Sequence, residues 1–167
     1  MTLLVVLSGP PGIGKSTAGD ALAALRPVVR LSIDDAEDAM RACGVPPEAS
    51  GVAAYEVVRA AAEQNLRLGA DVVVDAVNDS APARETWRRA ADATGAALLQ
   101  VVLGMDDAAA HRARLEGRSR PFTRIPEPAW ADVTALRIAP WPASALRLDA
   151  ALPPDELARA VLAALPA

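Results

Sequence analysis

Residues 3–17 have the sequence LLVVLSGPPGIGKST and contain two features in succession. Residues 3–7 form a continuous apolar run, which is typical of a strand buried on both faces of a sheet. Residues 9–16 match the pattern GxxxxGK[ST] in full, and helical spacing follows over residues 16–25. A strand, a glycine-rich loop and a helix in this order predict a phosphate-binding loop.

The chemistry of this loop predicts which nucleotide groups it binds. Its glycines let successive backbone N–H groups point at one anion, and the N-terminus of the following helix adds partial positive charge. We expect Lys15 to contact the β- and γ-phosphates of ATP and the Ser16 hydroxyl to ligate Mg²⁺. The alternative is a glycine-rich turn that binds nothing, but Lys15 is the one lysine among 17 basic residues. The nucleotide is expected to contact Gly9, Pro10, Pro11, Gly12, Ile13, Gly14, Lys15, Ser16 and Thr17.

Strands and helices are predicted to alternate along the rest of the chain. Further strands are expected at residues 28–33, 71–75, 97–103 and 146–148. Helices are expected at residues 34–42, 52–68, 81–94, 106–116, 127–138 and 154–165, with a loop at 44–51. This alternation is typical of an α/β sandwich built on a parallel sheet, and the length of 167 residues predicts one domain.

The composition excludes several classes of protein. A single cysteine, Cys43, rules out an intrachain disulfide and a cysteine-based zinc site, and the single histidine, His111, is expected on an exposed helix face. The net charge of -4 and an aromatic content of 3% argue against a nucleic-acid partner. Neither a signal peptide nor a membrane span is recognisable, so a cytoplasmic protein without a membrane partner is expected. The oligomeric state is not indicated.

Carboxylates follow two of the predicted strands. Asp34 and Asp35 follow the second strand, and Asp75 ends the run VVVD of the third. In a parallel α/β sheet the carboxyl ends of the strands face the ligand, so Asp34 is a candidate general base for an acceptor hydroxyl. The alternative is that Asp34 or Asp35 caps the helix that follows. Asp75 is a candidate Mg²⁺ ligand beside Ser16.

An arginine-rich segment follows His111. It holds five arginines within 13 positions, split by Gly117 between a helix end and a polar loop at about residues 117–126. Planar, permanently charged guanidinium groups suit a transferring phosphoryl group, so we expect Arg118 and Arg120 to act in a lid and Arg112 to contact the nucleotide. The alternative is a solvated face in which arginine replaces lysine.

Four segments together resemble the small P-loop kinases, most closely the chloramphenicol phosphotransferase-like and polynucleotide-kinase-like groups. They are GPPGIGKST at 9–17, SIDD at 32–35, VVVDAVN at 72–78 and the arginine-rich segment. The resemblance implies a three-layer P-loop NTPase sandwich with a five-stranded parallel sheet in the order 2-3-1-4-5. It also implies that Asp34 is the base, and that Asp75 and Asn78 belong to the site. The lid and acceptor signatures of gluconate and adenylate kinases are not found.

These features predict that residues 1–167 form a single P-loop kinase domain. We expect it to transfer the γ-phosphoryl group of ATP, with Mg²⁺, to a hydroxyl of a small molecule such as a nucleoside, a sugar or an antibiotic-like metabolite. Two alternatives remain at this point. One is a polynucleotide 5′-hydroxyl kinase, and the other is an ATPase or nucleotide switch that acts through a protein partner.

Overall fold

The central sheet is parallel and five-stranded in the computed structural model, which describes residues 1–165; residues 166 and 167 of the expected domain lie outside the described residues. The strand order is β2-β3-β1-β4-β5, which confirms the expected order. Every residue of β1 and β3 is buried, as the apolar runs predict for central strands. The strands are β1 (Leu3–Ser8), β2 (Val29–Ser32), β3 (Val72–Ala76), β4 (Ala97–Gly104) and β5 (Leu146–Asp149).

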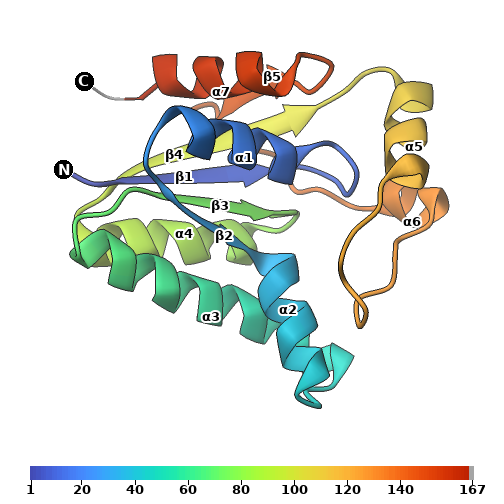
Figure 1. Ribbon diagram of the computed structural model, residues 1–167, viewed down its shortest axis with the longest axis horizontal. Helices are drawn as coiled ribbons and strands as arrows, with labels where there is room; N and C mark the ends of the chain where they lie inside the picture. Colours follow the sequence, from blue (N-terminus) through green and yellow to red (C-terminus); the bar gives the residue numbers. More distant parts are fainter. Residues whose placement is uncertain (166–167) are drawn as a thin grey trace.

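Helices cover both faces of the sheet (Figure 1). On one face lie α1 (Lys15–Leu25) and α7 (Pro154–Ala163). On the other lie α3 (Pro47–Arg67) and α4 (Ala81–Thr94), with α2 (Ile33–Ala42) packed against α3. No helix in the part of the chain that the structure describes has both the length and the apolar character required to cross a membrane.

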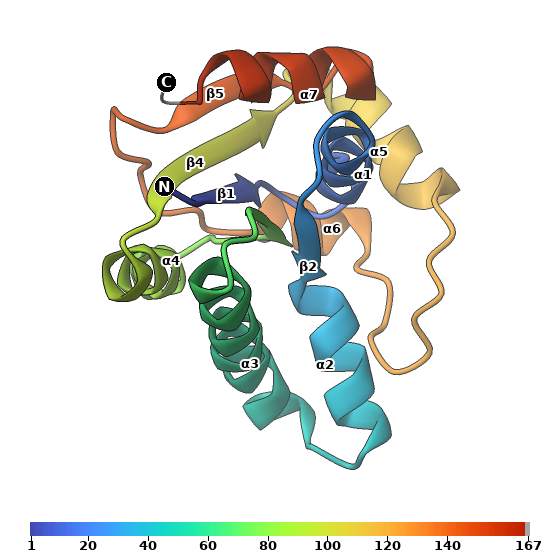
Figure 2. The same cartoon turned by 60° about the vertical axis from the view of Figure 1, so that its left-hand side comes forward.

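Two further helices lie beyond the carboxyl ends of the strands (Figures 1 and 2). They are α5 (Ala108–Gly117) and α6 (Trp130–Ala135). The segment that joins them, residues 118–129, is called the arginine loop below. This loop runs from α5 along the side of α2. It lies beyond the carboxyl ends of the strands, which is the edge where a parallel sheet presents its ligand-binding residues.

The alternation of side chains along β1 builds two separate cores. Leu4 and Val6 pack with Trp87 under α3 and α4, whereas Val5 and Leu7 pack under α1 and α7. Because successive strand residues point to opposite faces, a continuous apolar run supplies both cores at once. The carboxyl end of β1 is therefore held rigidly from both sides, and the phosphate-binding loop starts there.

Two helices differ from their predicted ranges by three residues or more at one end or both. Helix α3 begins at Pro47, although a loop at 44–51 and a helix from residue 52 were expected. The first N–H groups of a helix have no partner within it, so the missing N–H of a proline costs nothing at the first position. The fixed φ of proline also suits the first turn, and Pro47 therefore starts this helix. Helix α6 is also shorter than the expected range 127–138, since Glu127 belongs to the arginine loop and pairs with its arginines.

Candidate functional site

The loop between β1 and α1 has the backbone that a phosphate-binding loop requires. Gly9 and Gly14 have φ angles of 145° and 103°, which side-chain-bearing residues rarely adopt. A Cβ on Gly9 would also lie 2.6 Å from the carbonyl oxygen of Leu103. The first turn of α1 contains no acidic residue, and its N-cap Gly14 makes no side-chain cap hydrogen bond. The positive end of this helix therefore faces the loop with no acidic residue in its own first turn.

Lys15 is folded back over this loop. Its Nζ donates hydrogen bonds to the carbonyl oxygens of Gly9 and Pro10, at 2.9 and 3.0 Å. Burial lowers the pKa of Lys15 to about 8, while the negative charges of Asp75 and Asp34 oppose this shift. At neutral pH the ammonium group stays charged but poorly hydrated, which strengthens its attraction for a phosphate.

Asp75, at the end of β3, joins α1 to β2. Its Oδ1 accepts hydrogen bonds from the hydroxyls of Ser16, at 3.4 Å, and Ser32, at 3.1 Å. Its Oδ2 accepts one from Nη2 of Arg30, at 2.9 Å. The parallel register of β2 and β3 places Ser32 directly opposite Asp75. Burial raises the pKa of Asp75, and the charges of Arg30 and Lys15 oppose that rise.

The donor set around Ser16 and Asp75 fits Mg²⁺. A hydroxyl and a carboxylate face each other there, and both are oxygen ligands of the kind that Mg²⁺ prefers. Within residues 1–165 no group of three or more His, Cys, Asp or Glu side chains could hold a metal ion. A magnesium ion at Ser16 and Asp75 would therefore take its other ligands from phosphate oxygens and water, as is usual for nucleotide sites.

The arginine loop brings its cations to the same place. Nε of Arg118 and Nε of Arg120 donate to the two carboxylate oxygens of Glu127, at 3.0 and 2.5 Å. Nη1 of Arg120 also donates to Oδ2 of Asp34, at 2.5 Å. Burial acts to raise the pKa of Glu127, but the hydrogen bonds from Arg120 and Arg118 outweigh it and the pKa is lowered. Glu127 thus remains charged and keeps both guanidinium groups together.

Asp34 and Asp35 have different surroundings in the first turn of α2. The N-cap of this helix is Ser32, so neither aspartate takes the capping position that the sequence left open. Asp34 lines a cavity of about 890 Å³, whereas Asp35 is exposed. Asp34 is therefore the aspartate of this pair that a bound molecule would meet.

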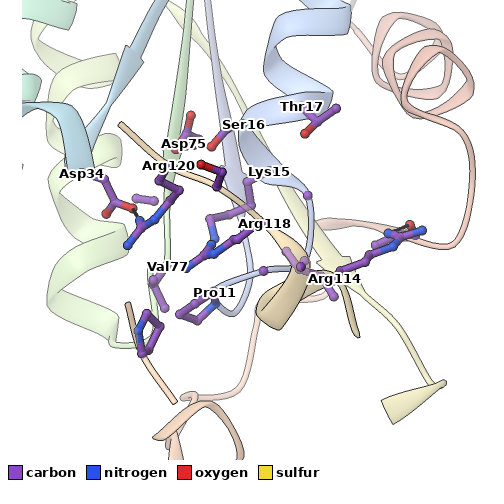
Figure 3. A pocket seen from close by; sticks show the side chains of 18 of the residues that line it. Pro11, Lys15, Ser16, Thr17, Asp34, Asp75, Val77, Arg114, Arg118 and Arg120 are labelled. Carbon is purple, nitrogen blue, oxygen red and sulfur yellow. Dashed lines mark hydrogen bonds and ion pairs between the residues drawn. The ribbon is translucent and has the colours of Figure 1, made fainter. Parts of the chain in front are cut away.

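The cavity collects most of the predicted site residues (Figure 3). Asp34 lies on one side of it and Arg114 on the other, with Lys15 and Arg118 between them. Two predicted nucleotide contacts, Gly9 and Pro10, do not line it; their carbonyl oxygens accept the hydrogen bonds from Lys15. The predicted site residues in its lining are Pro11, Gly12, Ile13, Gly14, Lys15, Ser16, Thr17, Asp34, Asp75, Arg118 and Arg120.

The structure does not bring Arg112, an expected nucleotide contact, together with the other predicted site residues. Arg112 is 57% exposed, lies outside this cavity and pairs with Glu116 at 2.7 Å. Arg114 lines the cavity instead, and its Nη1 donates to the carbonyl oxygen of Ala150 at 2.6 Å. Residues two apart on a helix point about 200° apart, so only one of these two arginines faces the site.

Two buried polar residues support the loop. His111, which was expected to be exposed, is buried with its Nε2 2.9 Å from the carbonyl oxygen of Pro11. Asn78 is fully buried at φ 53°, and its side chain donates to Ser8 Oγ and accepts from Trp87 Nε1, both at 2.8 Å. The Asn78 N–H donates to the hydroxyl of Tyr55 at 3.2 Å. Asn78 thereby ties β3 to the end of β1.

Replacing Asn78 by alanine should destabilise the fold by about 2–4 kcal/mol, because Ser8 and Trp87 would each keep a buried polar group without its partner. Alanine also tolerates a positive φ less well than asparagine. Chemical denaturation measures this change in the free energy of unfolding. Asn65→Ala is the matched control, since the side chain of Asn65 donates to the carbonyl oxygen of Ala61 in its own helix, at 2.8 Å, and joins no other element. Equal stability of the two variants would contradict the supporting role of Asn78.

Comparison with known proteins identifies the family. A family model described as "AAA domain" matches residues 4–140. The chain belongs to the AAA domain family. A search of curated proteins finds no match.

This AAA domain protein also resembles solved kinase structures. A sugar kinase from Janibacter sp. HTCC2649 matches at TM-score 0.72 and 17% identity, over 98% of this chain and 94% of the other. A gluconokinase from Sinorhizobium meliloti 1021 matches at 0.65 and 21%, over 96% and 90%. The APS kinase CysC of Mycobacterium tuberculosis, in complex with AMPPNP and APS, matches at 0.66 and 20%, over 97% and 96%. The expected likeness to small P-loop kinases is confirmed for the fold.

Proposed function

We propose that this protein transfers the γ-phosphoryl group of ATP to a hydroxyl group of a small molecule. The observation that carries the proposal is the cavity in which Asp34 lies across from the phosphate-binding loop, with Lys15, Arg118 and Arg120 between them. A kinase requires this arrangement: a nucleotide on one side, an acceptor beside a proton-accepting group on the other, and cations where the phosphoryl group passes.

The residues on the nucleotide side have separable roles. Residues 11–17, Lys15 among them, would hold the phosphates, and Ser16 and Asp75 would hold Mg²⁺, whose positive charge would offset that of the phosphates. Arg118 and Arg120 stabilise the charge of the transferring group. Nη2 of Arg118 is buried and makes no hydrogen bond of good geometry to the described residues, although it lies 2.8 Å from Oε2 of Glu127. A phosphoryl oxygen would satisfy this donor.

Asp34 is proposed as the general base. The acceptor oxygen bonds to the γ-phosphorus while the bond to the β,γ-bridging oxygen breaks, and ADP is the leaving group. The hydroxyl proton passes to the carboxylate of Asp34. Nη1 of Arg120 donates to Oδ2 of Asp34, so the acceptor hydroxyl competes with Arg120 for this carboxylate. When the acceptor hydroxyl replaces Arg120 at Asp34, the guanidinium of Arg120 becomes free to bind the phosphoryl oxygens.

The size and charge of the protein favour a small acceptor. The cavity volume of about 890 Å³ is within the range of about 300–1,000 Å³ found for small-molecule sites. The net charge of -4 would repel a nucleic-acid strand outside the arginine loop. The sugar kinase, the gluconokinase and the APS kinase named above also act on small molecules, which supports this acceptor class.

An acceptor screen tests the proposal. ATP labelled at the γ-phosphate is incubated with sugars, nucleosides, polyols, hydroxylated antibiotics and a 5′-hydroxyl oligonucleotide under identical salt, and label transfer is measured with ADP release. We expect label on a small alcohol in equal amount to ADP. Label on the oligonucleotide alone would favour an end kinase. ADP and free phosphate without a labelled product would favour the ATPase or switch.

A further inference from the structure

The carboxylate of Asp38 binds three consecutive backbone groups of the arginine loop. Its Oδ1 accepts hydrogen bonds from the N–H groups of Thr123, Arg124 and Ile125, at 3.1, 2.7 and 3.1 Å. The N–H of Arg124 is the main cause of a lowered pKa of Asp38, so this carboxyl is charged at neutral pH. These bonds join segments 85 to 87 residues apart in the sequence.

A second residue of α2 holds the same segment. Nη1 of Arg41 donates to the carbonyl oxygen of Arg124 at 3.3 Å. The guanidinium of Arg41 is itself fixed by Glu37, at 2.6 Å, and by Ser50 Oγ of α3, at 3.0 Å. Helix α2 therefore binds both the N–H groups and a carbonyl of residues 123–125, and α3 supports it from behind.

This contact sets where the arginines of the loop lie. Three residues before Thr123, Arg120 packs over the ring of Phe122, with Cζ 4.8 Å from the ring centroid, and donates to Asp34. Asp38 is one helical turn beyond Asp34 on α2 and outside the lining of the cavity. On the function proposed above, on which this step rests, Asp34 has to exchange Arg120 for the acceptor hydroxyl. The loop then needs an attachment that does not depend on Asp34.

We propose that Asp38 is a positioning residue that clamps the arginine loop to α2 and so keeps Arg120 beside the phosphoryl group while Asp34 acts on the acceptor. The loop and the proposed base are then carried by one helix. A shift of the loop would misplace Arg118 and Arg120 together, because Glu127 binds both of them.

Hydrogen exchange of the intact protein tests the clamp without reference to activity. In Asp38→Ala we expect the amides of residues 123–125 to exchange about ten-fold faster or more, while exchange in α2 stays unchanged. The three N–H groups would have lost their hydrogen bonds to Asp38, so opening of the loop would cost less free energy. Asp38→Asn keeps an oxygen acceptor without its charge and should give an intermediate rate. Unchanged exchange at residues 123–125 in Asp38→Ala, or equally increased exchange throughout α2, would overturn the clamp.

Kinetics then test the positioning role. With an acceptor found in the screen, Asp38→Ala should lower kcat by about ten- to a hundred-fold, the size expected from small misplacement of catalytic groups, while the Kd of MgAMPPNP changes less than about two-fold. Glu48→Gln, at an exposed carboxylate in the first turn of α3, is the control and should match wild type. Faster exchange at residues 123–125 with a normal kcat would overturn the positioning role. If no acceptor is phosphorylated, the proposed function fails, and the exchange data still decide the clamp.

Discussion

Replacing Lys15 by alanine is expected to lower kcat/KM for phosphoryl transfer by about 10²–10³-fold or more, the cost of removing one donor to the developing charge. The half-buried side chain folds back over the phosphate-binding loop, and it is the lysine of the loop that would contact the phosphates. The fold should persist, because burial lowers the pKa of Lys15 from 10.5 to about 8. A lowered pKa means that the charged ammonium group of Lys15 is less favourable in the folded protein than in the unfolded chain. Removing this group therefore costs the fold little free energy of unfolding.

Calorimetry with AMPPNP in the absence of magnesium isolates this contact. The affinity of Lys15→Ala should fall sharply, while Arg147→Ala, which removes an exposed cation on β5, should bind as wild type does. Wild-type affinity should also fall as the pH rises above about 8, where Lys15 loses its proton while the phosphates are fully ionised. This decline should be absent from Lys15→Ala. An unchanged affinity in that variant would contradict the assignment of the loop.

The sequence predicts those parts of the fold whose residues lie close together along the chain. The apolar run, the glycines and Lys15 of the phosphate-binding loop follow one another within residues 3–17, so local pattern alone places them. Asp75 could also be found, because it ends an apolar run. The strand order was available only through the resemblance to small P-loop kinases.

The partners of these residues depend on segments far apart in the chain. Arg30 pairs with Asp75 across 45 residues, and Arg120 pairs with Asp34 across 86. No periodicity distinguishes Arg30 from other arginines, although its spacing of two from Ser32 places both on one face of β2. His111 was expected to be exposed, because the helix pattern does not show that Trp130 of α6 folds back against it, at 5.1 Å between ring centroids.

Asp34→Asn should lower the turnover of the acceptor by about 10²–10⁴-fold, the usual contribution of a general base. Asparagine has the same shape and still accepts a hydrogen bond from Arg120, but it does not take up the hydroxyl proton. Affinity for MgAMPPNP should stay the same or become slightly tighter, since the change removes a negative charge that acts on Lys15. Steady-state kinetics and calorimetry of the same preparation separate these two effects.

Asp35→Asn makes the identical chemical change one residue later, on an exposed side chain that does not line the cavity, and should turn over normally. Asp75→Asn gives the opposite signature to Asp34→Asn, because losing a proposed magnesium ligand should weaken MgAMPPNP binding itself. Normal turnover in Asp34→Asn with loss in Asp35→Asn would assign the base to the other aspartate. Weakened nucleotide binding in Asp34→Asn would place this residue on the nucleotide side of the cavity, since a group that acts only on the acceptor leaves that affinity intact.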